Sequence, residues 1–153
     1  MAESVADEIV VRPLRQDDFD RVVGIDRQHF GKERANYFAR RLAIALDNSE
    51  QIIISLVAEV AGEVAGFIMG ERNLGAFGIP ESTASVDAIG VAKGFEKRGV
   101  GSALLEDFIR TVRVAGVKKL YTRVVWNDLP LIRFFDSVGF VPAPMINLEL
   151  ALG

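Results

Sequence analysis

The sequence contains no cysteine and only one histidine, His29. Without cysteine, the chain forms no disulfides and no thiolate metal sites, and it has no cysteine nucleophile. A single histidine cannot supply a cluster of histidine ligands. We therefore expect no resident metal. We also expect a cytoplasmic location, because a chain without cysteine has no disulfides that would require an oxidising compartment.

A large charge of one sign is also missing. The chain has 18 basic and 21 acidic residues, which gives a formal net charge of -3 at pH 7. Such a chain has no global attraction to nucleic acid or to anionic lipid, so we expect neither as a partner. An anionic ligand would have to be held by local groups.

Long hydrophobic runs are absent as well. The longest apolar stretch, residues 52–69, is broken by two glutamates and two glycines, which favours strands over a membrane span. The first residues, MAESVADE, lack the basic and apolar regions of a secretion signal, and we expect residues 1–7 to be a disordered acidic tail. Residues 8–153 contain no repeat or linker and are predicted to form a single domain.

The hydrophobic periodicity of the remaining residues predicts alternating strands and helices. Strands are expected within 8–14, 51–60, 63–72, 85–91, 118–125 and 140–152, with a hairpin turn at Ala61-Gly62. Helices are expected from Asp17 or Asp18 onward and over 33–46, 99–115 and 128–139. This order is typical of an α/β or α+β sheet wrapped by helices.

The most informative segment is GFEKRGVGSALL, residues 94–105, in which two closely spaced glycines precede a helical pattern. A nucleotide-binding Walker loop needs Lys and a hydroxyl residue where this chain has Val100 and Gly101. A dinucleotide fingerprint needs a third glycine where this chain has Leu104. Both interpretations are therefore excluded.

A strand, a cationic turn and a helix start remain. The free amides at the amino terminus of a helix bind phosphate oxygens, and glycine lets the phosphate approach closely. Lys93, Lys97 and Arg98 add positive charge at this point. Taken alone, the two glycines could equally serve only to turn the chain into the helix.

Two motifs together resemble a known family. VAKGFEKRGVGSALL is similar to the acetyl-coenzyme A (acetyl-CoA) motif of the GNAT acyltransferase superfamily, a strand followed by [QR]-x-x-G-x-[GA] and a helix. WNDLPLIRFFDSVGFVP resembles the second GNAT signature, with Asn127 and the Val138-Gly139-Phe140 step. The resemblance covers residues 8–152 and implies the GNAT fold, a mixed central sheet of six to seven strands, with strands four and five splayed apart, flanked by about four helices.

The resemblance also implies a set of acetyl-CoA contacts. The backbone of Ile89 and Val91 would meet the pantetheine arm, and Asn127 would contact the arm from the other wall or cap the following helix. The pyrophosphate would lie on the amides of the loop and helix start, which are those of Lys97, Arg98, Gly99, Val100, Gly101 and Ser102.

The chain departs from the GNAT pattern at two positions. Glu96 stands where the pattern has Gln or Arg, which brings a carboxylate near a diphosphate unless it points to solvent or pairs with a neighbouring cation. Phe135 stands where many members carry the Tyr that protonates the departing thiolate, and Phe has no proton to give. A general acid contributes about 10²- to 10⁴-fold, so its loss need not abolish turnover.

Other residues are candidates for the proton transfers. Asp87 is our candidate base, because a strand period of two places it on the same face as Ile89 and Val91; a structural hydrogen-bond acceptor is the alternative. Tyr121 is our candidate acid. Glu71 and Glu81 are weaker options for the base.

We expect an acetyl-CoA-dependent N-acetyltransferase that acts on a primary amine in a small molecule, a peptide N-terminus or a lysine. A CoA-binding module whose catalysis has decayed is the alternative, because of Glu96 and Phe135. The prolines near the end leave the last strand free to pair with a partner chain, as in a homodimer. The acceptor is expected over the two early helices and the loop 74–85, and the candidate residues on the helices are Asp26, His29, Phe30, Glu33, Arg34 and Tyr37.

Overall fold

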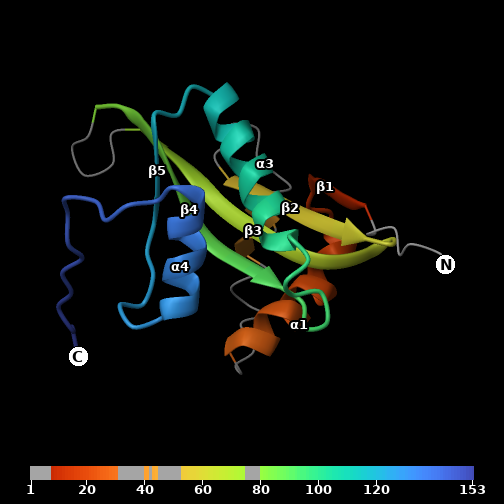
Figure 1. Ribbon diagram of the computed structural model, residues 1–153. Coiled ribbons are helices and arrows are strands. Elements are labelled where there is room, and N and C mark those ends of the chain that lie inside the picture. Colours follow the sequence, from red (N-terminus) through yellow and green to blue (C-terminus); the bar gives the residue numbers. More distant parts are fainter. Residues whose placement is uncertain (1–7, 31–39, 42, 45–52, 75–79) are drawn as a thin grey trace. The chain divides into compact units, whose positions relative to one another are not determined.

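The computed structural model describes residues 8–30, 40, 41, 43, 44, 53–74 and 80–153 (Figure 1). The chain divides into two compact units, Met1–Arg123 and Val124–Gly153. The elements of the first unit are β1 (Ile9–Pro13), the 3-10 helix η1 (Gln16–Asp18), α1 (Phe19–Phe30), β2 (Ile53–Val60), β3 (Glu63–Leu74), β4 (Ser82–Val91), α3 (Val100–Val114) and β5 (Lys119–Thr122). The second unit contains α4 (Leu129–Val138).

The first unit is built on one mixed sheet with the strand order β1-β2-β3-β4-β5. The strands β1 to β4 pair antiparallel, whereas β4 and β5 pair parallel because α3 carries the chain back across the sheet. The β2–β3 turn is made by Ala61 and Gly62, both with positive φ, as the sequence predicted.

Helices α1 and α3 cover opposite faces of this sheet. Val22, Val23 and Ile25 of α1 form one core cluster with residues of β2 and β3, and we call that side the α1 face; the strand residues are Val57, Phe67 and Met69. On the other side, the α3 face, a Cβ atom added at Gly66 would meet side chains of α3. The predicted α3 stripe is confirmed, since Val100, Leu104, Phe108 and Val112 are all buried.

The predicted mixed α+β architecture is confirmed, but not its element count. The described residues contain five strands and three α-helices whose bounds are defined, where six to seven strands and about four helices were expected. The predicted helix 33–46 falls largely outside the described residues. The four residues of this range that are described, 40, 41, 43 and 44, are helical. The predicted last strand is wrong, because residues 140–153 form no strand and Pro142 and Pro144 interrupt its first half.

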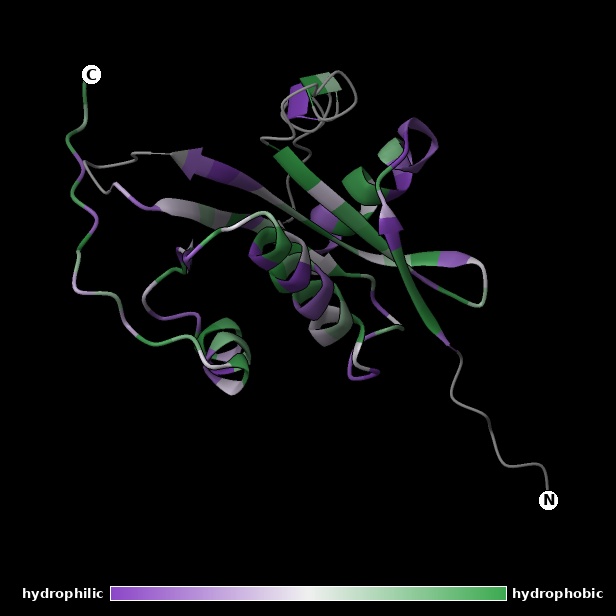
Figure 2. Cartoon of the chain, turned by 90° about the horizontal axis from the view of Figure 1, so that it is seen from above, coloured by the Kyte–Doolittle hydropathy of each residue, from purple (hydrophilic) through white to green (hydrophobic). Residues whose placement is uncertain are grey.

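The second unit consists of α4 and the segment after it. Asp128 caps α4 by accepting a hydrogen bond from the amide of Leu131, and Gly139 ends the helix in the left-handed conformation. Beyond α4, hydrophobic and hydrophilic residues alternate along the segment that ends at the label C (Figure 2). In the part of the chain that the structure describes, no helix is long and apolar enough to cross a membrane.

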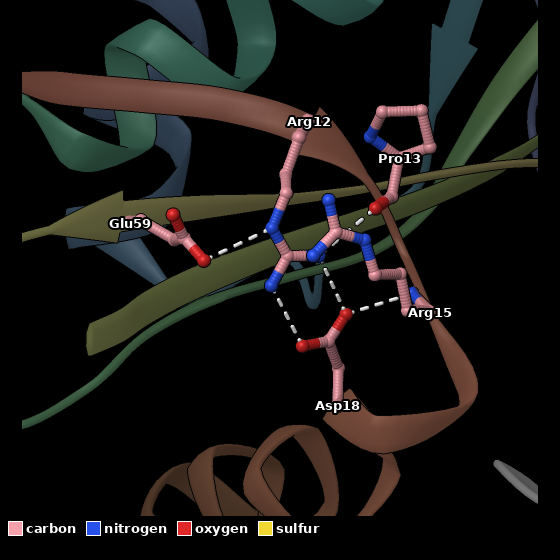
Figure 3. Close-up of polar contacts among 5 residues, drawn as sticks. All are labelled: Arg12, Pro13, Arg15, Asp18 and Glu59. Carbon is pink, nitrogen blue, oxygen red and sulfur yellow. Dashed lines mark hydrogen bonds and ion pairs between the residues drawn. The ribbon is translucent and has the colours of Figure 1, made fainter. Parts of the chain in front are cut away.

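Arg12 of β1 is nearly buried and links this strand to η1 and β2 (Figure 3). Arg12 donates to both carboxylate oxygens of Asp18 at 2.8 Å and to Glu59 Oε1 at 3.0 Å. The amide of Arg15 donates to Asp18 Oδ2 at 2.7 Å. The Arg12 hydrogen bond is the largest cause that lowers the pKa of Asp18, and the same bond raises the pKa of Arg12.

This cluster predicts an acid-sensitive stability. Because the pKa of Asp18 is lower in the folded state than its ordinary value of 3.8, the stabilisation is present above pH 3.8 and is lost as the pH falls through the folded-state pKa. Asp18→Asn should reduce the free energy of unfolding at pH 7 by about 2–3 kcal/mol and flatten its dependence on pH below 4. Urea unfolding from pH 2.5 to 7 measures both effects, and Glu59→Gln, with one contact to Arg12, should cost less. An equal loss in both variants would contradict this account.

A second prediction concerns how closely α3 approaches the sheet. A Cβ atom at Gly70 would lie 2.1 Å from Ser85 O and 2.4 Å from Phe108 Cζ, so strand or helix would have to move. Gly70→Ala should lower the free energy of unfolding by about 2–3 kcal/mol. The control is Gly24→Ala in α1, where nothing lies within 4 Å and the lower entropy of the unfolded chain should stabilise the fold slightly. Thermal unfolding that ranks the two variants in the opposite order would refute the tight packing.

Candidate active site

The glycine segment forms a loop that leads from β4 into α3. Phe95 packs against the core cluster under α1, and its amide bonds to Ala92 O at 3.0 Å. Gly94, Lys97 and Gly99 all have positive φ, which glycine adopts freely and lysine adopts rarely. The loop is thus anchored by one aromatic side chain while its remaining residues are exposed.

The amino terminus of α3 offers unpaired main-chain donors. Gly99 is the N-cap residue and makes no side-chain cap hydrogen bond, and the first bond into the helix is that of the Ala103 amide to Gly99 O at 3.0 Å. The amides of Val100, Gly101 and Ser102 precede this bond, so they have no acceptor within the helix. No acidic residue lies in the first turn. This arrangement fits an anionic group such as a diphosphate.

The charges around the loop add to this field. Lys93, Lys97 and Arg98 are exposed, and the Arg98 guanidinium lies 5.4 Å from the centre of the Phe95 ring. Glu96, the residue that departs from the GNAT pattern, is exposed too. Because its carboxylate is solvated, it opposes the cations less than a buried carboxylate would.

Strands β4 and β5 separate at the point where β5 ends. The two strands pair only from Thr83 and Lys119 to Val86 and Thr122, and Thr122 Oγ1 donates to Val86 O at 3.0 Å. Beyond Val86, β4 continues to Val91 alongside β3 alone. Within the described residues, the other edge of β4 is therefore open over residues 87–91.

The open edge carries the backbone groups that the sequence analysis singled out. The amide of Ala92 donates to Ala65 O of β3, and the backbone groups of successive residues in a strand point to alternate sides. The N–H and C=O groups of Ile89 and Val91 are consequently directed away from β3. An extended ligand could pair with them there as an additional strand would.

A β-bulge corrects one expectation about this strand. Met69 of β3 faces Ala88, but Gly70 faces Val86, so Asp87 is an extra residue in β4. The side chains of Ile89 and Val91 share the α3 face with Ile68 and Gly66, which they oppose. The prediction that Asp87 shares their face is wrong, because the bulge shifts the alternation by one residue.

Asp87 instead belongs to a charged cluster at the start of the open edge. Its Oδ1 accepts from Ser85 Oγ at 2.8 Å, and its Oδ2 accepts from Arg41 Nη2 at 3.0 Å. Arg41 Nη1 also lies 3.5 Å from Glu71 Oε2. The arginine side chain is only 17% exposed, against 28% for Asp87 and 38% for Glu71. One guanidinium thus bridges two carboxylates on neighbouring strands.

Tyr121 lies on the same face as this cluster. It is the register partner of Ser85, and paired residues in a sheet share a face, as Ser85 does with Glu71. Tyr121 and Asp87 are therefore both next to Ser85, one across the sheet and one along the strand. The structure brings the two residues expected to transfer protons to one place, at the end of the β4–β5 pairing.

Two residues of α1 contact the far end of the open edge, and the sequence did not indicate this role. Since a carbonyl oxygen only accepts, His29 Nε2 is the donor in its 2.6 Å contact with Val91 O. Gln28 Oε1 accepts from the amide of Lys93 at 2.9 Å. These bonds fix the junction of β4 and the loop, although they span more than 60 residues of sequence.

The other predicted site residues have more varied surroundings. Asn127 is exposed in the second unit, and the cap of α4 is Asp128, so the expectation that Asn127 caps this helix is wrong. Asp26 is buried and Glu81 is exposed. The predicted acceptor residues Glu33, Arg34 and Tyr37 lie outside the described residues. Among the described residues, no group of three acidic or histidine side chains is placed to hold a metal ion.

Phe135 occupies an aromatic cluster within the second unit. Its ring is buried and makes edge contacts with Phe134 and Phe140, with centroids 5.3 Å and 5.0 Å away. The ring therefore stabilises the packing between α4 and the residue that follows its cap, Phe140.

Comparison with known proteins places this geometry in a family. Residues 12–140 match the model of the acetyltransferase (GNAT) family. The chain is also 27% identical over 152 residues to an N-alpha-acetyltransferase of Sulfurisphaera tokodaii, with 95% of this chain and 88% of that protein covered.

Solved structures share the fold at low sequence identity. Aminoglycoside N-acetyltransferase AAC(6')-Iy in complex with CoA has a TM-score of 0.80 and 14% identity, covering 99% of this chain and all of that one. A ribosomal-protein-alanine N-acetyltransferase from Brucella melitensis biovar Abortus has a TM-score of 0.75 and 15% identity, covering 95% and 100%. The motifs, the fold and the family match agree, and the chain belongs to the acetyltransferase (GNAT) family.

Proposed function

We propose that this protein transfers an acetyl group from acetyl-CoA to a primary amine in a ternary complex. The observation that carries the proposal is that the chain has two sets of open backbone groups. The first set is the amides at the start of α3, and the second is the N–H and C=O groups along the free edge of β4. A diphosphate needs the first and an extended pantetheine arm needs the second. The match of the family model across both units supports residues 8–153 acting as a single domain.

The residues that hold acetyl-CoA follow from this arrangement. The amides from Lys97 to Ser102 bind the diphosphate, with local attraction from Lys97 and Arg98. The N–H and C=O groups of Ile89 and the N–H group of Val91 bind the arm, because Val91 O already accepts a hydrogen bond from His29. Asn127 is proposed to contact the arm as well, by resemblance to the family. Bound in this way, acetyl-CoA supplies an activated acyl group.

The chain's own polar residues handle the protons. A protonated amine first releases one proton to solvent, which frees the lone pair of its nitrogen. When this nitrogen bonds to the acyl carbon and the bond to sulfur breaks, the nitrogen gives up a second proton and the sulfur takes one. We assign the transfer from nitrogen to Asp87 and the transfer to sulfur to Tyr121. The Asp87 carboxylate accepts hydrogen bonds from Arg41 and Ser85, which orient it. Arg41 also forms an ion pair with Glu71.

The acceptor is proposed to be cationic at neutral pH. Two carboxylates, Asp87 and Glu71, share one guanidinium, which leaves this cluster with one excess negative charge. Such a field attracts a protonated amine. Peptide N-termini are one class of acceptor, in keeping with the name of the N-alpha-acetyltransferase relative. Lysines and the primary amines of small molecules are the other classes.

A second candidate function is a CoA-binding module without catalysis. The observation in its favour is Phe135, whose ring is buried among aromatic neighbours at the position where many family members carry the acidic Tyr. Such a module would bind acetyl-CoA but release no thiol with any amine. Thiol release measured across peptides, lysine derivatives and aminoglycosides distinguishes the two functions.

The proposed acetyl-CoA site can be tested with a variant that should weaken acetyl-CoA binding without lowering the stability of the fold. Ser102→Asp places a carboxylate in the first turn of α3, where the helix dipole favours it, so the fold should be as stable or slightly more stable. The same carboxylate repels the diphosphate, and the dissociation constant of acetyl-CoA should rise at least about 10-fold. Calorimetric titration measures the constant, with Val114→Glu at the exposed far end of α3 as the control. If the Ser102→Asp variant bound acetyl-CoA with unchanged affinity, the assignment of the diphosphate to the start of α3 would be wrong.

The proton-transfer assignment is tested by the turnover rates of two variants. Asp87→Asn and Tyr121→Phe should each lower kcat by about 10²- to 10⁴-fold, because each removes a group that we assign to move a proton. Acetyl-CoA affinity should stay within about 3-fold in both variants, because neither side chain is assigned to its binding. Glu71→Gln is the matched control, since it also removes a carboxylate partner of Arg41. If Glu71→Gln lowers kcat as much as Asp87→Asn does, the role of Asp87 is structural.

A further inference from the structure

We propose that Gln28 and His29, in the last turn of α1, close the open edge of β4 and set the register in which the pantetheine arm of acetyl-CoA pairs with this edge. They are positioning residues, because they act through the backbone of β4 and the loop. Both elements belong to the first unit. The inference rests on the proposed function, since it concerns the strand edge to which we assign the arm.

Gly90 allows α1 to come close to this edge. A Cβ atom at Gly90 would lie 2.8 Å from Phe67 Cε1 and 3.3 Å from Ile25 Cγ2, so a side chain there would force the Phe67 ring to shift. Gln28 and His29 follow Ile25 by three and four residues, the spacing of one helical turn, so all three lie on the same side of α1. The packing of Ile25 against the strand therefore brings the two polar side chains to its end.

The two side chains bond to the outward backbone groups at the end of the edge. His29 Nε2 donates to Val91 O at 2.6 Å, and Gln28 Oε1 accepts from the amide of Lys93 at 2.9 Å. Within the described residues, the N–H and C=O groups of Ile89 and the N–H group of Val91 face no neighbouring strand on this side. The groups that stay open are thus a donor, an acceptor and a donor, in that order along the chain.

A pantetheine arm can match these three groups in one register. Its two amide groups present carbonyl oxygens and N–H groups in alternation, so an extended arm can pair with the edge as a strand does. A slip by one strand repeat would move the arm by about 7 Å. A slip toward Lys93 would meet an acceptor and a donor that are already bonded to α1. The two bonds therefore keep the thioester near the end of the edge where Asp87 lies.

A role in stability alone would have different consequences. Gln28 and His29 are both exposed, and an exposed hydrogen bond adds little net stability. Their loss should therefore leave the chain folded. It should instead change which amides at this edge exchange with solvent and which pair with the arm.

The first test compares two double variants of matched size by amide hydrogen exchange, in the free chain and with CoA added. Gln28→Met/His29→Phe removes the acceptor and the donor, whereas Gln28→Glu/His29→Gln keeps one of each. In the native chain we expect the Lys93 amide to be protected without ligand. Added CoA should slow the exchange of the Ile89 and Val91 amides by about 10-fold or more.

The two variants should then differ at one amide. In Gln28→Met/His29→Phe, the Lys93 amide should exchange about 10-fold or more faster in the free chain, and CoA should slow it again because the arm can now pair there. Gln28→Glu/His29→Gln should behave as the native chain does. If CoA does not slow the Lys93 amide of Gln28→Met/His29→Phe, or if the two variants behave alike, α1 does not set the register and the inference is wrong.

Calorimetric titration separates this inference from the proposed function. The two ligands are CoA and 3'-phospho-ADP, which carries the diphosphate of CoA but no pantetheine arm. We expect the dissociation constant of 3'-phospho-ADP to agree within about 2-fold between the native chain and Gln28→Met/His29→Phe, since its contacts are assigned to the start of α3.

Two results would contradict this expectation in different ways. A native chain that binds neither ligand would refute the proposed function and this inference with it. A native chain that binds both ligands, with the affinity for 3'-phospho-ADP lost in Gln28→Met/His29→Phe, would show that the two side chains only order the loop. That result would refute the inference and leave the proposed function standing.

Discussion

The proposed site depends on the point where β5 stops pairing with β4. Parallel strands joined by a helix usually continue side by side, but here the ladder ends at Val86 and Thr122 while β4 extends five residues further. The bulge at Asp87 coincides with this end. A bulge disrupts the pairing of a strand locally and increases its twist. Within the described residues, the outer backbone groups of β4 over residues 87–91 therefore meet no neighbouring strand, although Val91 O accepts a hydrogen bond from His29.

Open backbone groups also explain how an acidic chain can bind an anion. The formal charge of -3 gives no long-range attraction to a diphosphate. The amides at the start of α3 supply local, oriented donors without a net charge, and Gly99 lets the chain enter the helix with no side-chain cap occupying them. The part of the loop that follows β4 is held by Phe95 in the core and by the Gln28 bond to the amide of Lys93. Donors that are already in place bind at a lower entropic cost than donors that must be ordered.

The cluster of Arg41, Asp87 and Glu71 at the start of the open β4 edge joins parts of the chain that are far apart in sequence. Arg41 reaches Asp87 across 46 residues, and it links β3 to β4 where their register shifts. Removing one member of such a cluster leaves a half-buried charge without its partner, so its residues affect stability and reactivity together. That coupling is why the role of Asp87 is compared with that of Glu71, which has the same cationic partner.

The sequence by itself determined the elements that depend on local patterns. The α3 stripe, the Ala61-Gly62 hairpin and the glycine loop follow from periodicity and turn chemistry, which act over a few residues. The resemblance of the glycine loop and of the second motif was enough to identify the family. The role of the backbone groups of Ile89 and Val91 is a prediction of that resemblance. Only the tertiary structure decided the bulge that turns Asp87 to the α1 face, the Arg41 bridge and the His29 bond to Val91. These features depend on register between strands and on contacts across 46 and 62 residues, which no local pattern in one sequence records.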